Sequence, residues 1–300
     1  MEKNVLCVKN RDARQQYLAQ MLLEDGCQVT LCEEKCRELG EYELVLLPVV
    51  TAKLDLKQMI CQLQKGQRVF GGNLPEFFQD ACMEKGVSCY DYMEEETIAV
   101  KNAVATAEGA IAEAICFSEE TLYGAKVLVT GYGRCGRVLA DRLCGMRCEV
   151  TVLEQEPEKR AIAEISGCHS VQNIEEILTE HTAGEYRFLF HTIPVMIWKE
   201  AALKELPAGM TIIDIASGGG GVDHDYCQCH GIRAKLCPGL PGKYAPYTSA
   251  QIIADTILGM DVRNQFEIDQ AMLSIQGNGS ASVGGNAIAA VSAAVLKAGA

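Results

Sequence analysis

The sequence predicts an α/β protein with two Rossmann-like domains, each a doubly wound parallel sheet, joined by helices. Three observations predict this fold. Short apolar runs alternate with helical segments in both halves of the chain. A glycine-rich turn joins a strand to a helix near the middle of the chain. The length of 300 residues fits two domains on the usual prior of about 150 residues each.

We expect an N-terminal Rossmann-like domain over residues 1–104, completed by a returning helix at residues 246–260. A second Rossmann domain should span residues 105–245, and residues 261–300 should form a C-terminal extension. The alanine-rich segment Asn102–Phe117 favours a helix long enough to bridge the two domains. Thr106 is a plausible cap for this helix, which would place Glu108 near its start.

The first half alternates strands and helices. Its expected strands are residues 4–9, 28–31, 44–48 and 67–70, and its expected helices are residues 12–23, 58–64 and 74–85. The first strand runs into Lys9-Asn10-Arg11-Asp12 without a glycine fingerprint, so this domain should not hold dinucleotide phosphates. Asp12 and Arg14 follow that strand at the edge where ligands bind in such sheets, although helix capping and surface charge would explain them as well.

The most informative stretch is the G-x-G-x-x-G turn at residues 131–136. The apolar strand Ala125–Thr130 precedes it, and the helix after it should end near Gly145. Gly131 allows the tight turn, Gly133 lets the backbone approach a pyrophosphate, and Gly136 lets the helix pack closely on the strand. The turn therefore predicts dinucleotide binding, and a purely structural turn is the alternative; the binding residues would be Gly131, Tyr132, Gly133, Arg134, Cys135 and Gly136.

An acid completes this unit. The next strand, Glu149–Leu153, ends at Glu154, which lies 18 residues after Gly136, where an acid accepts hydrogen bonds from the adenosine ribose. A carboxylate there repels a 2′-phosphate, so NAD is favoured over NADP. Lys159 and Arg160 lie nearby and leave NADP open.

Three later strands, expected at residues 187–190, 211–215 and 233–236, each run into a polar or glycine-rich loop, and a helix is expected at residues 159–166. The loops are His191-Thr192-Ile193-Pro194, Ala216-Ser217 with Gly218–Gly221, and Cys237–Lys243. Parallel topology places all three at one carboxyl edge beside the fingerprint, which predicts a cleft for cofactor and substrate. In that cleft we assign cofactor contacts to Thr192, Ile193, Pro194 and Ala216.

Composition limits the partners. The net charge of −13 and the pI near 4.9 argue against nucleic acid as a partner, because no basic run is present to neutralise phosphates. No segment reaches the ~18 uninterrupted apolar residues of a membrane helix, and the N-terminus shows no apolar signal region. We therefore expect a cytoplasmic protein.

The 15 cysteines are scattered through the chain, which is typical of reduced and mostly buried thiols rather than of a disulfide framework. The spacing of Cys32 and Cys36 is best explained by chance. A zinc site is not predicted, because Cys-x-Cys on a helix directs its thiols to different faces and no second cluster balances it. The residues concerned are His224, Cys227, Cys229 and His230.

These motifs resemble dipicolinate synthase A, a two-domain dehydrogenase-like family of spore-forming bacteria. The matching residues run in order through residues 1–260: Asp12-Ala13-Arg14-Gln15, Leu47-Pro48-Val49, Thr106 with Glu108-Gly109, Gly131-x-Gly133-x-x-Gly136, Thr192-Ile193-Pro194, Asp214-Ile215-Ala216-Ser217, Gly220-Gly221-x-Asp223, and Pro238-Gly239-Leu240-Pro241-Gly242 with Ala245-Pro246. The resemblance implies a role in sporulation, oxidation of a dihydrodipicolinate-like lysine-pathway intermediate to dipicolinate with NAD(P), and a flavoprotein-like partner, dipicolinate synthase B. It implies substrate contacts at Asp12, Arg14, Glu108, Ser217, Gly239, Leu240, Pro241 and Gly242.

The last part of the chain resembles a different family. Residues 265–300 are similar to a piece of the enolase N-terminal domain, without the barrel in which enolases carry their catalytic residues. The role of this extension is unknown.

The proposed chemistry needs a base and cations. His191 or His224 could take a proton, because an imidazole titrates near neutral pH, and Arg14 and Lys243 could hold a dianionic dicarboxylate. We count His191, His224 and Lys243 as candidate catalytic residues. Two alternatives remain open: a non-catalytic NAD-binding sensor or diverged relative, and another two-domain NAD-dependent dehydrogenase. We also expect a homo-oligomer.

Overall fold

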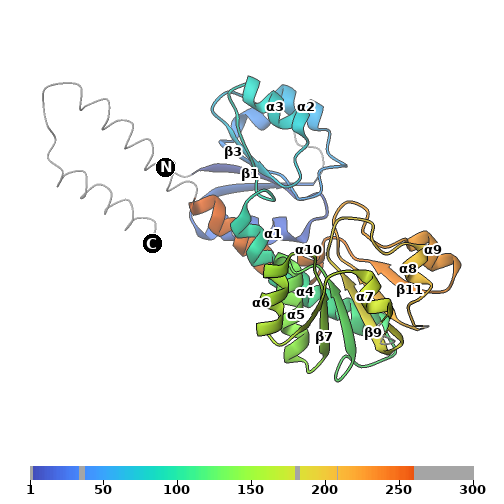
Figure 1. Cartoon of the computed structure of the whole chain (residues 1–300). Coiled ribbons are helices and arrows are strands. Elements are labelled where there is room, and N and C mark those ends of the chain that lie inside the picture. Colours follow the sequence, from blue (N-terminus) through green and yellow to red (C-terminus); the bar gives the residue numbers. More distant parts are fainter. Residues whose placement is uncertain (1–2, 34–37, 180–182, 208, 260–300) are drawn as a thin grey trace, which may run out of the picture.

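The protein is described by a computed structural model, which covers residues 3–33, 38–179, 183–207 and 209–259. Two parallel sheets form two lobes, and α4, α10 and α1 lie at their junction (Figure 1). The predicted fold class, two Rossmann-like α/β units joined by helices, is confirmed.

The first sheet has the strand order β2-β1-β3-β4-β5, and all its pairings are parallel. Both faces of its first strand are buried, because Val5 and Cys7 belong to one apolar cluster and Leu6 and Val8 to another. The strands are β1 (Asn4–Val8), β2 (Gln28–Cys32), β3 (Leu44–Leu46), β4 (Arg68–Gly71) and β5 (Ser88–Asp91).

The second sheet has the order β11-β10-β9-β6-β7-β8 and is also parallel. The chain runs from β6 outward through β7 and β8, then returns to the other side of β6 with β9. The order therefore reverses between β6 and β9, which is where dinucleotides bind in such sheets. The strands are β6 (Lys126–Thr130), β7 (Glu149–Leu153), β8 (His169–Val171), β9 (Tyr186–His191), β10 (Thr211–Asp214) and β11 (Arg233–Leu236).

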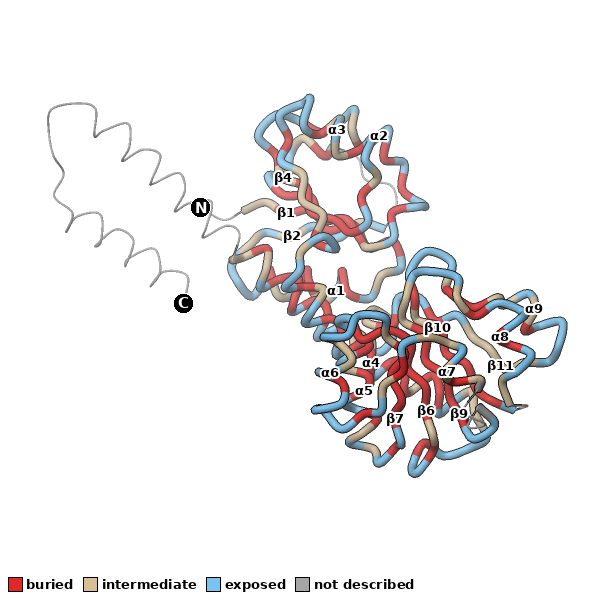
Figure 2. Tube along the Cα trace, viewed as in Figure 1, coloured by how far each residue is buried: buried red, intermediate tan, exposed pale blue. Residues whose placement is uncertain are grey.

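Helices cover both faces of this second sheet, so that its strands are buried while the outer surfaces of the helices are exposed (Figure 2). The helices of the whole described chain are α1 (Ala13–Glu24), α2 (Leu56–Gln62), α3 (Glu76–Glu84), α4 (Glu96–Phe117), α5 (Arg134–Gly145), α6 (Pro157–Ile165), α7 (Ile174–Thr179), α8 (Glu200–Leu203), α9 (His224–Cys229) and α10 (Leu240–Tyr244), with short 3-10 turns at Leu39–Glu41 and Ala183–Glu185. Residues 246–259 form one more helical segment.

Two helical segments carry the chain between the lobes. The first is α4, and the second is residues 246–259, in which Ile253 and Ile257 pack into the core of the first sheet. The two segments meet where the Ser249 hydroxyl lies 3.1 Å from Oδ1 of Asn102. The returning segment therefore contributes to the core of the N-terminal lobe.

Two expectations about α4 are wrong. The helix begins at Glu96 rather than at Asn102, so Thr106 is not its cap. The Thr106 hydroxyl instead donates to the Asn102 carbonyl within the helix, at 2.9 Å. Glu108 consequently lies in the middle of the helix and not near its start. No capping side chain marks the true start, where Glu95 makes no cap hydrogen bond.

The cysteines follow the expectation with one exception. The described cysteines other than Cys32 are free, and most of them are buried or half-buried. Cys32, the last residue of β2, is disulfide-bonded, so the expectation of reduced thiols is wrong there. Its place at the end of an edge strand leaves it more accessible than the thiols inside the sheets.

No helix in the part of the chain that the structure covers combines the length and the apolar character needed to cross a membrane.

Candidate functional site

The glycine turn between β6 and α5 has the geometry of a phosphate-binding turn. Gly131 has a φ of +90°, a conformation that residues with side chains rarely adopt. A Cβ at position 136 would overlap the carbonyl oxygen of Gly131, so the close packing of α5 on the turn requires glycine there. Around Gly133, in contrast, a Cβ would meet nothing within 4 Å. The backbone at Gly133 is therefore open to an approaching ligand.

Glu154 lies directly beside this turn. Its Oε2 accepts a hydrogen bond from the backbone N–H of Tyr132 at 2.9 Å, and its Oε1 accepts one from the N–H of Glu156 at 3.2 Å. The turn and the acid at the end of β7 thus form one unit, although 22 residues of sequence separate Tyr132 from Glu154. A carboxylate held here can accept ribose hydroxyls and repels a 2′-phosphate.

Lys159 and Arg160, the two nearby cations for which NADP was kept as an alternative, both make contacts within the chain. Lys159 Nζ lies 2.7 Å from Oε1 of Glu156. Arg160 Nη1 donates to the carbonyl oxygens of Glu154 and Gln155, at 3.0 and 2.7 Å.

The other predicted cofactor contacts flank the turn. Thr192 Oγ1 donates to the Thr130 carbonyl at 2.8 Å, and a Cβ at Gly131 would lie 2.8 Å from Ile193. Pro194 follows in the same loop. Arg134 begins α5, and its Nη1 lies 2.6 Å from Oε2 of Glu96 at the start of α4. Cys135, the next residue of α5, is half-buried.

Asp214, at the end of β10, organises the glycine-rich loop that follows it. Its Oδ1 accepts from the N–H of Ala216 at 3.0 Å, and its Oδ2 accepts from the N–H groups of Gly221 and Val222 at 2.8 and 3.2 Å. Gly220 has a φ of +83°, and a Cβ there would overlap the Asp214 carboxylate. Ser217, predicted to contact substrate, lies exposed in this loop.

Sequence reasoning did not select Asp214 as a site residue. The available signal was an acid directly after the apolar run Ile212-Ile213, at the carboxyl end of a predicted buried strand. The side chain has no exposed surface. A carboxylate so deeply buried requires hydrogen-bond donors, which the backbone of the glycine-rich loop supplies.

The two candidate histidines differ in accessibility. His224 begins α9, its side chain is 26% exposed, and its Nε2 lies 3.2 Å from Oδ2 of Asp214. His191 has no exposed surface; its Nδ1 lies 2.6 Å from Oγ1 of Thr130 and its Nε2 lies 2.6 Å from the carbonyl oxygen of Ile193. Burial lowers the pKa of His191. The structure therefore does not support His191 as a base that touches substrate, because both ring nitrogens are bonded inside the core.

Arg14, which is predicted to contact substrate, lies against Gly242 in the segment Pro238–Gly242. A Cβ at Gly242 in α10 would lie 3.1 Å from Cζ of Arg14, so the absence of a side chain lets the guanidinium pack against the helix. Arg14 makes two bonds to Asp12, from Nε to Oδ1 at 2.8 Å and from Nη2 to Oδ2 at 2.7 Å. Gly239, with a φ of +68°, precedes the buried Leu240 and then Pro241. Residues from both lobes are thus brought together here.

Glu108 is not part of this group. It lies exposed on α4, where its Oε1 is 3.9 Å from Nε of Arg142 in the last turn of α5. That turn is at the opposite end of α5 from the glycine turn. A substrate contact at Glu108 therefore has no support from this geometry.

Lys243 is ion-paired. The buried Glu113 of α4 accepts hydrogen bonds from Lys243 and from Lys235, the latter at 2.6 Å. Burial raises the pKa of Glu113, but the hydrogen bonds from Lys235, Lys243 and Tyr244 outweigh it and bring the pKa to about 2. Glu113 therefore stays charged and links α4 to Lys235 of β11 and to Lys243 of α10.

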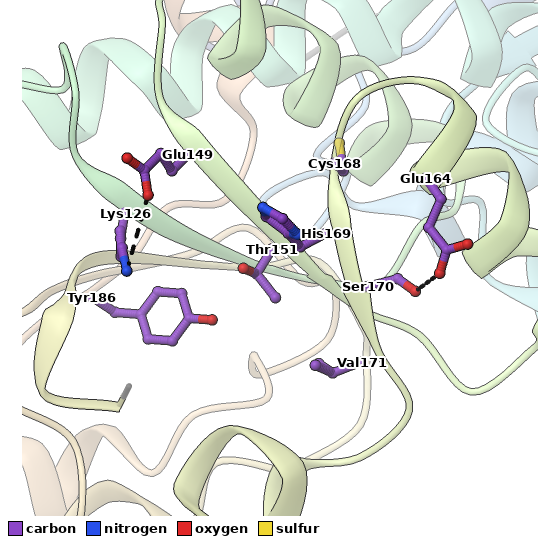
Figure 3. A pocket seen from close by; sticks show the side chains of 9 residues that line it. All are labelled: Lys126, Glu149, Thr151, Glu164, Cys168, His169, Ser170, Val171 and Tyr186. Atoms are coloured by element: carbon purple, nitrogen blue, oxygen red, sulfur yellow. Dashed lines mark hydrogen bonds and ion pairs between the residues drawn. The ribbon is translucent and has the colours of Figure 1, made fainter. Parts of the chain in front are cut away.

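A pocket of about 420 Å³ lies at the opposite, amino-terminal edge of the second sheet (Figure 3). Lys126, Glu149 and Tyr186, the first residues of β6, β7 and β9, line it together with His169 and Ser170. It does not coincide with the predicted cleft. Among the residues that the structure covers, no group of three or more His, Cys, Asp or Glu side chains is arranged to hold a metal ion.

The chain is similar over most of its length to dipicolinate synthase A. Dipicolinate synthase A of Bacillus subtilis (strain 168) is 31% identical over 189 residues, which are 63% of each protein. The match thus spans less than two thirds of that relative. The crystal structure of dipicolinate synthase A from Bacillus halodurans superposes with a TM-score of 0.77 at 26% identity, over 86% of this chain and 97% of that one.

Dehydrogenases share the fold. D-lactate dehydrogenase from Escherichia coli superposes with a TM-score of 0.67 at 14% identity, over 87% of this chain and 97% of that one. The enolase N-terminal domain family matches residues 239–300. This match begins earlier than the expected residue 265, just before α10, but most of it lies outside the described residues.

Proposed function

Because the chain resembles dipicolinate synthase A in sequence and in fold, we propose that it is an NAD(P)-dependent oxidoreductase of that kind. It would oxidise a dihydrodipicolinate-like lysine-pathway intermediate to dipicolinate, in sporulation, together with the flavoprotein-like dipicolinate synthase B. We also propose the division into a substrate-side domain, residues 1–104 with 246–260, and a cofactor domain, residues 105–245. Cytoplasmic location and a homo-oligomeric state belong to the same proposal.

The observation that carries this function is the open backbone of the glycine turn at Gly133, with Glu154 hydrogen-bonded beside it. Together they fit an NAD(P) adenosine diphosphate: N–H groups at the start of α5 for the phosphates, and a carboxylate for the ribose. The carboxylate and the engaged side chains of Lys159 and Arg160 favour NAD.

When bound, the oxidised nicotinamide supplies a hydride acceptor. The chain supplies the frame around it: the loop at Thr192–Pro194 and the loop between Ala216 and Gly221 lie at one carboxyl edge of the sheet. A dicarboxylate substrate needs cationic or N–H donors. Arg14 and the backbone of α10 lie together at the junction of the lobes and are our candidates for this contact.

One observation favours the non-catalytic alternative. The two cations predicted to bind the dianion already have carboxylate partners, Arg14 in Asp12 and Lys243 in Glu113. A protein that binds NAD without oxidising a dicarboxylate would need neither cation free. The discriminating measurement is whether a pyridine or dihydropyridine dicarboxylate raises NAD affinity or produces reduced cofactor.

The experiment that tests the function begins with calorimetric titration of the purified protein with NAD and with NADP, repeated for Glu154→Ala. We expect NAD to bind more tightly than NADP, and the substitution to weaken NAD at least about tenfold, which corresponds to 1.4 kcal/mol. Turnover is then measured with dipicolinate synthase B present, as NAD(P)-dependent formation of dipicolinate. If the wild-type protein binds neither nucleotide, the glycine turn is structural and the oxidoreductase proposal fails.

A further inference from the structure

The proposed oxidation requires a group that accepts a proton, and the pair formed by Asp214 and His224 provides one. Both residues are at the carboxyl edge of the second sheet, the edge that carries the glycine turn: Asp214 ends β10, and His224 follows the glycine-rich loop. They differ in exposure, since Asp214 is completely buried and the side chain of His224 is 26% exposed. A buried carboxylate thus holds an imidazole that reaches the surface.

The hydrogen bonds around Asp214 determine which nitrogen of His224 carries the hydrogen. Oδ2 of Asp214 already accepts from the N–H groups of Gly221 and Val222, so it is an acceptor. Nε2 of His224, 3.2 Å from that oxygen, must therefore be the donor. A neutral imidazole with hydrogen on Nε2 has its lone pair on Nδ1. No hydrogen bond from another described side chain or backbone group to Nδ1 of His224 is present.

The glycine-rich loop fixes this arrangement. Gly220 and Gly221 fold over the Asp214 carboxylate and over His191, and a Cβ at either glycine would overlap Asp214 or Nε2 of His191. His191 is another ionisable group beside the pair, and burial lowers its pKa, so it stays neutral and does not compete for the carboxylate. Rigid support of this kind reduces the cost of orienting a catalytic group.

We propose, resting on the oxidoreductase function above, that Nδ1 of His224 accepts the proton of the oxidation and that Asp214 is the positioning residue that sets its tautomer. The dihydropyridine ring loses one hydride and one proton. A ring C–H bond breaks and its electron pair leaves with the hydrogen to the NAD(P) co-reactant. A second ring hydrogen leaves as a proton to Nδ1, its bonding electrons complete the aromatic ring, and the imidazolium then releases the proton to water.

The test uses a substitution that keeps the structural hydrogen bond and removes the base. In His224→Gln the side-chain amide nitrogen can replace Nε2 as the donor to Asp214, but no basic nitrogen remains. We expect an unchanged unfolding temperature and unchanged NAD affinity. In the complex with dipicolinate synthase B, kcat should fall about 10²–10⁴-fold with KM little changed. If His224 only anchors the loop, His224→Gln turns over like the wild type, and that result overturns the proposal.

A second measurement needs no turnover. Nitrogen-15 NMR of the histidines in the free full-length protein should show His224 with hydrogen on Nε2 and none on Nδ1. In Asp214→Asn a neutral amide replaces a charge-assisted acceptor, a bond about half as strong, so a population with hydrogen on Nδ1 should appear. A wild-type spectrum with hydrogen on Nδ1 refutes the assignment even if the protein is an active oxidoreductase. Absence of NAD binding or of turnover in the wild type refutes the proposed function instead, and leaves the tautomer to be judged by the spectrum.

Discussion

Substitution of alanine for glycine at two positions of the turn should separate ligand binding from stability. At Gly133 the backbone has φ −77° and ψ −160°, which alanine adopts without strain, and a Cβ there meets nothing within 4 Å. At Gly136 a Cβ would lie 2.9 Å from the carbonyl carbon of Gly131 and overlap its oxygen, whereas carbon contacts are ordinarily about 3.5–4.0 Å. The first change fits the free protein, and the second does not.

The expected magnitudes follow from these contacts. In Gly133→Ala, alanine is the poorer N-cap residue but restricts the unfolded chain, two effects of at most about 1 kcal/mol that oppose each other. The unfolding free energy should therefore change by less than about 1 kcal/mol, while the new methyl group occupies the approach to the backbone and weakens NAD at least about tenfold. Gly136→Ala must displace α5 from the turn, which costs about 1–3 kcal/mol or more.

The assay pairs calorimetric NAD titration with urea unfolding for each variant. Gly145→Ala is the matched control, because Gly145 ends the same helix, has open space around it and lies far from the turn. We expect it to bind NAD like the wild type. If Gly133→Ala also binds NAD with wild-type affinity, the open backbone at Gly133 is not the phosphate site and the reasoning fails.

Three further predictions concern packing and charge. Glu113→Gln should lower the unfolding free energy at pH 7 by about 1–3 kcal/mol. Because the pKa of Glu113 in the folded protein is about 2, its charge stabilises the wild type above the unfolded pKa near 4.5, and this stabilisation is lost as pH falls toward 2. Urea unfolding should therefore give similar unfolding free energies for the two proteins in acid. Burial lowers the pKa of His191, so the wild type should lose stability as pH falls below about 6.5, by up to about 1.4 kcal/mol per pH unit, and His191→Asn should show a shallower slope in the same assay. Gly242→Val should push the Arg14 guanidinium away from α10, which should lower the unfolding free energy by about 1–3 kcal/mol and with it the unfolding temperature. An unchanged unfolding temperature would show that Arg14 can move away without loss of stability.

The unit β6–α5–β7 was predictable because the sequence features that mark it lie close together in the chain. The strand Glu149–Leu153 was predicted to the residue, since three consecutive β-branched residues, Val150 to Val152, stand just before Leu153 and the acid Glu154. The edge strands β5 and β8 were not predicted. Most of their residues, such as Ser88 and His169, are exposed or half-buried, and so they lack the apolar run that marks a central strand.

The sequence predicts at which edge of the sheet the site lies, but not which residues contact one another there. Chain order and parallel topology place His191 and His224 at that edge, but burial decides between them, and burial depends on packing across β6, β9 and the glycine-rich loop. The ion-pair partners of the two candidate cations also depend on the folded structure. Arg14 and Lys243 are recognisable as charges, yet their carboxylate partners come from a short-range contact with Asp12 and from Glu113, 130 residues away from Lys243 in the chain.

The ion pair between Glu96 and Arg134 connects the two lobes at their surface, because Glu96 begins the helix that leaves the first sheet and Arg134 begins the helix that leaves the glycine turn. Both side chains are more than half exposed, so the pair contributes only ~0–1 kcal/mol. Another anion can therefore replace Glu96 as the partner of Arg134 at little cost. A phosphate bound at the turn would compete with Glu96 for the Arg134 guanidinium, so occupancy of the turn would remove one surface contact between α4 and α5.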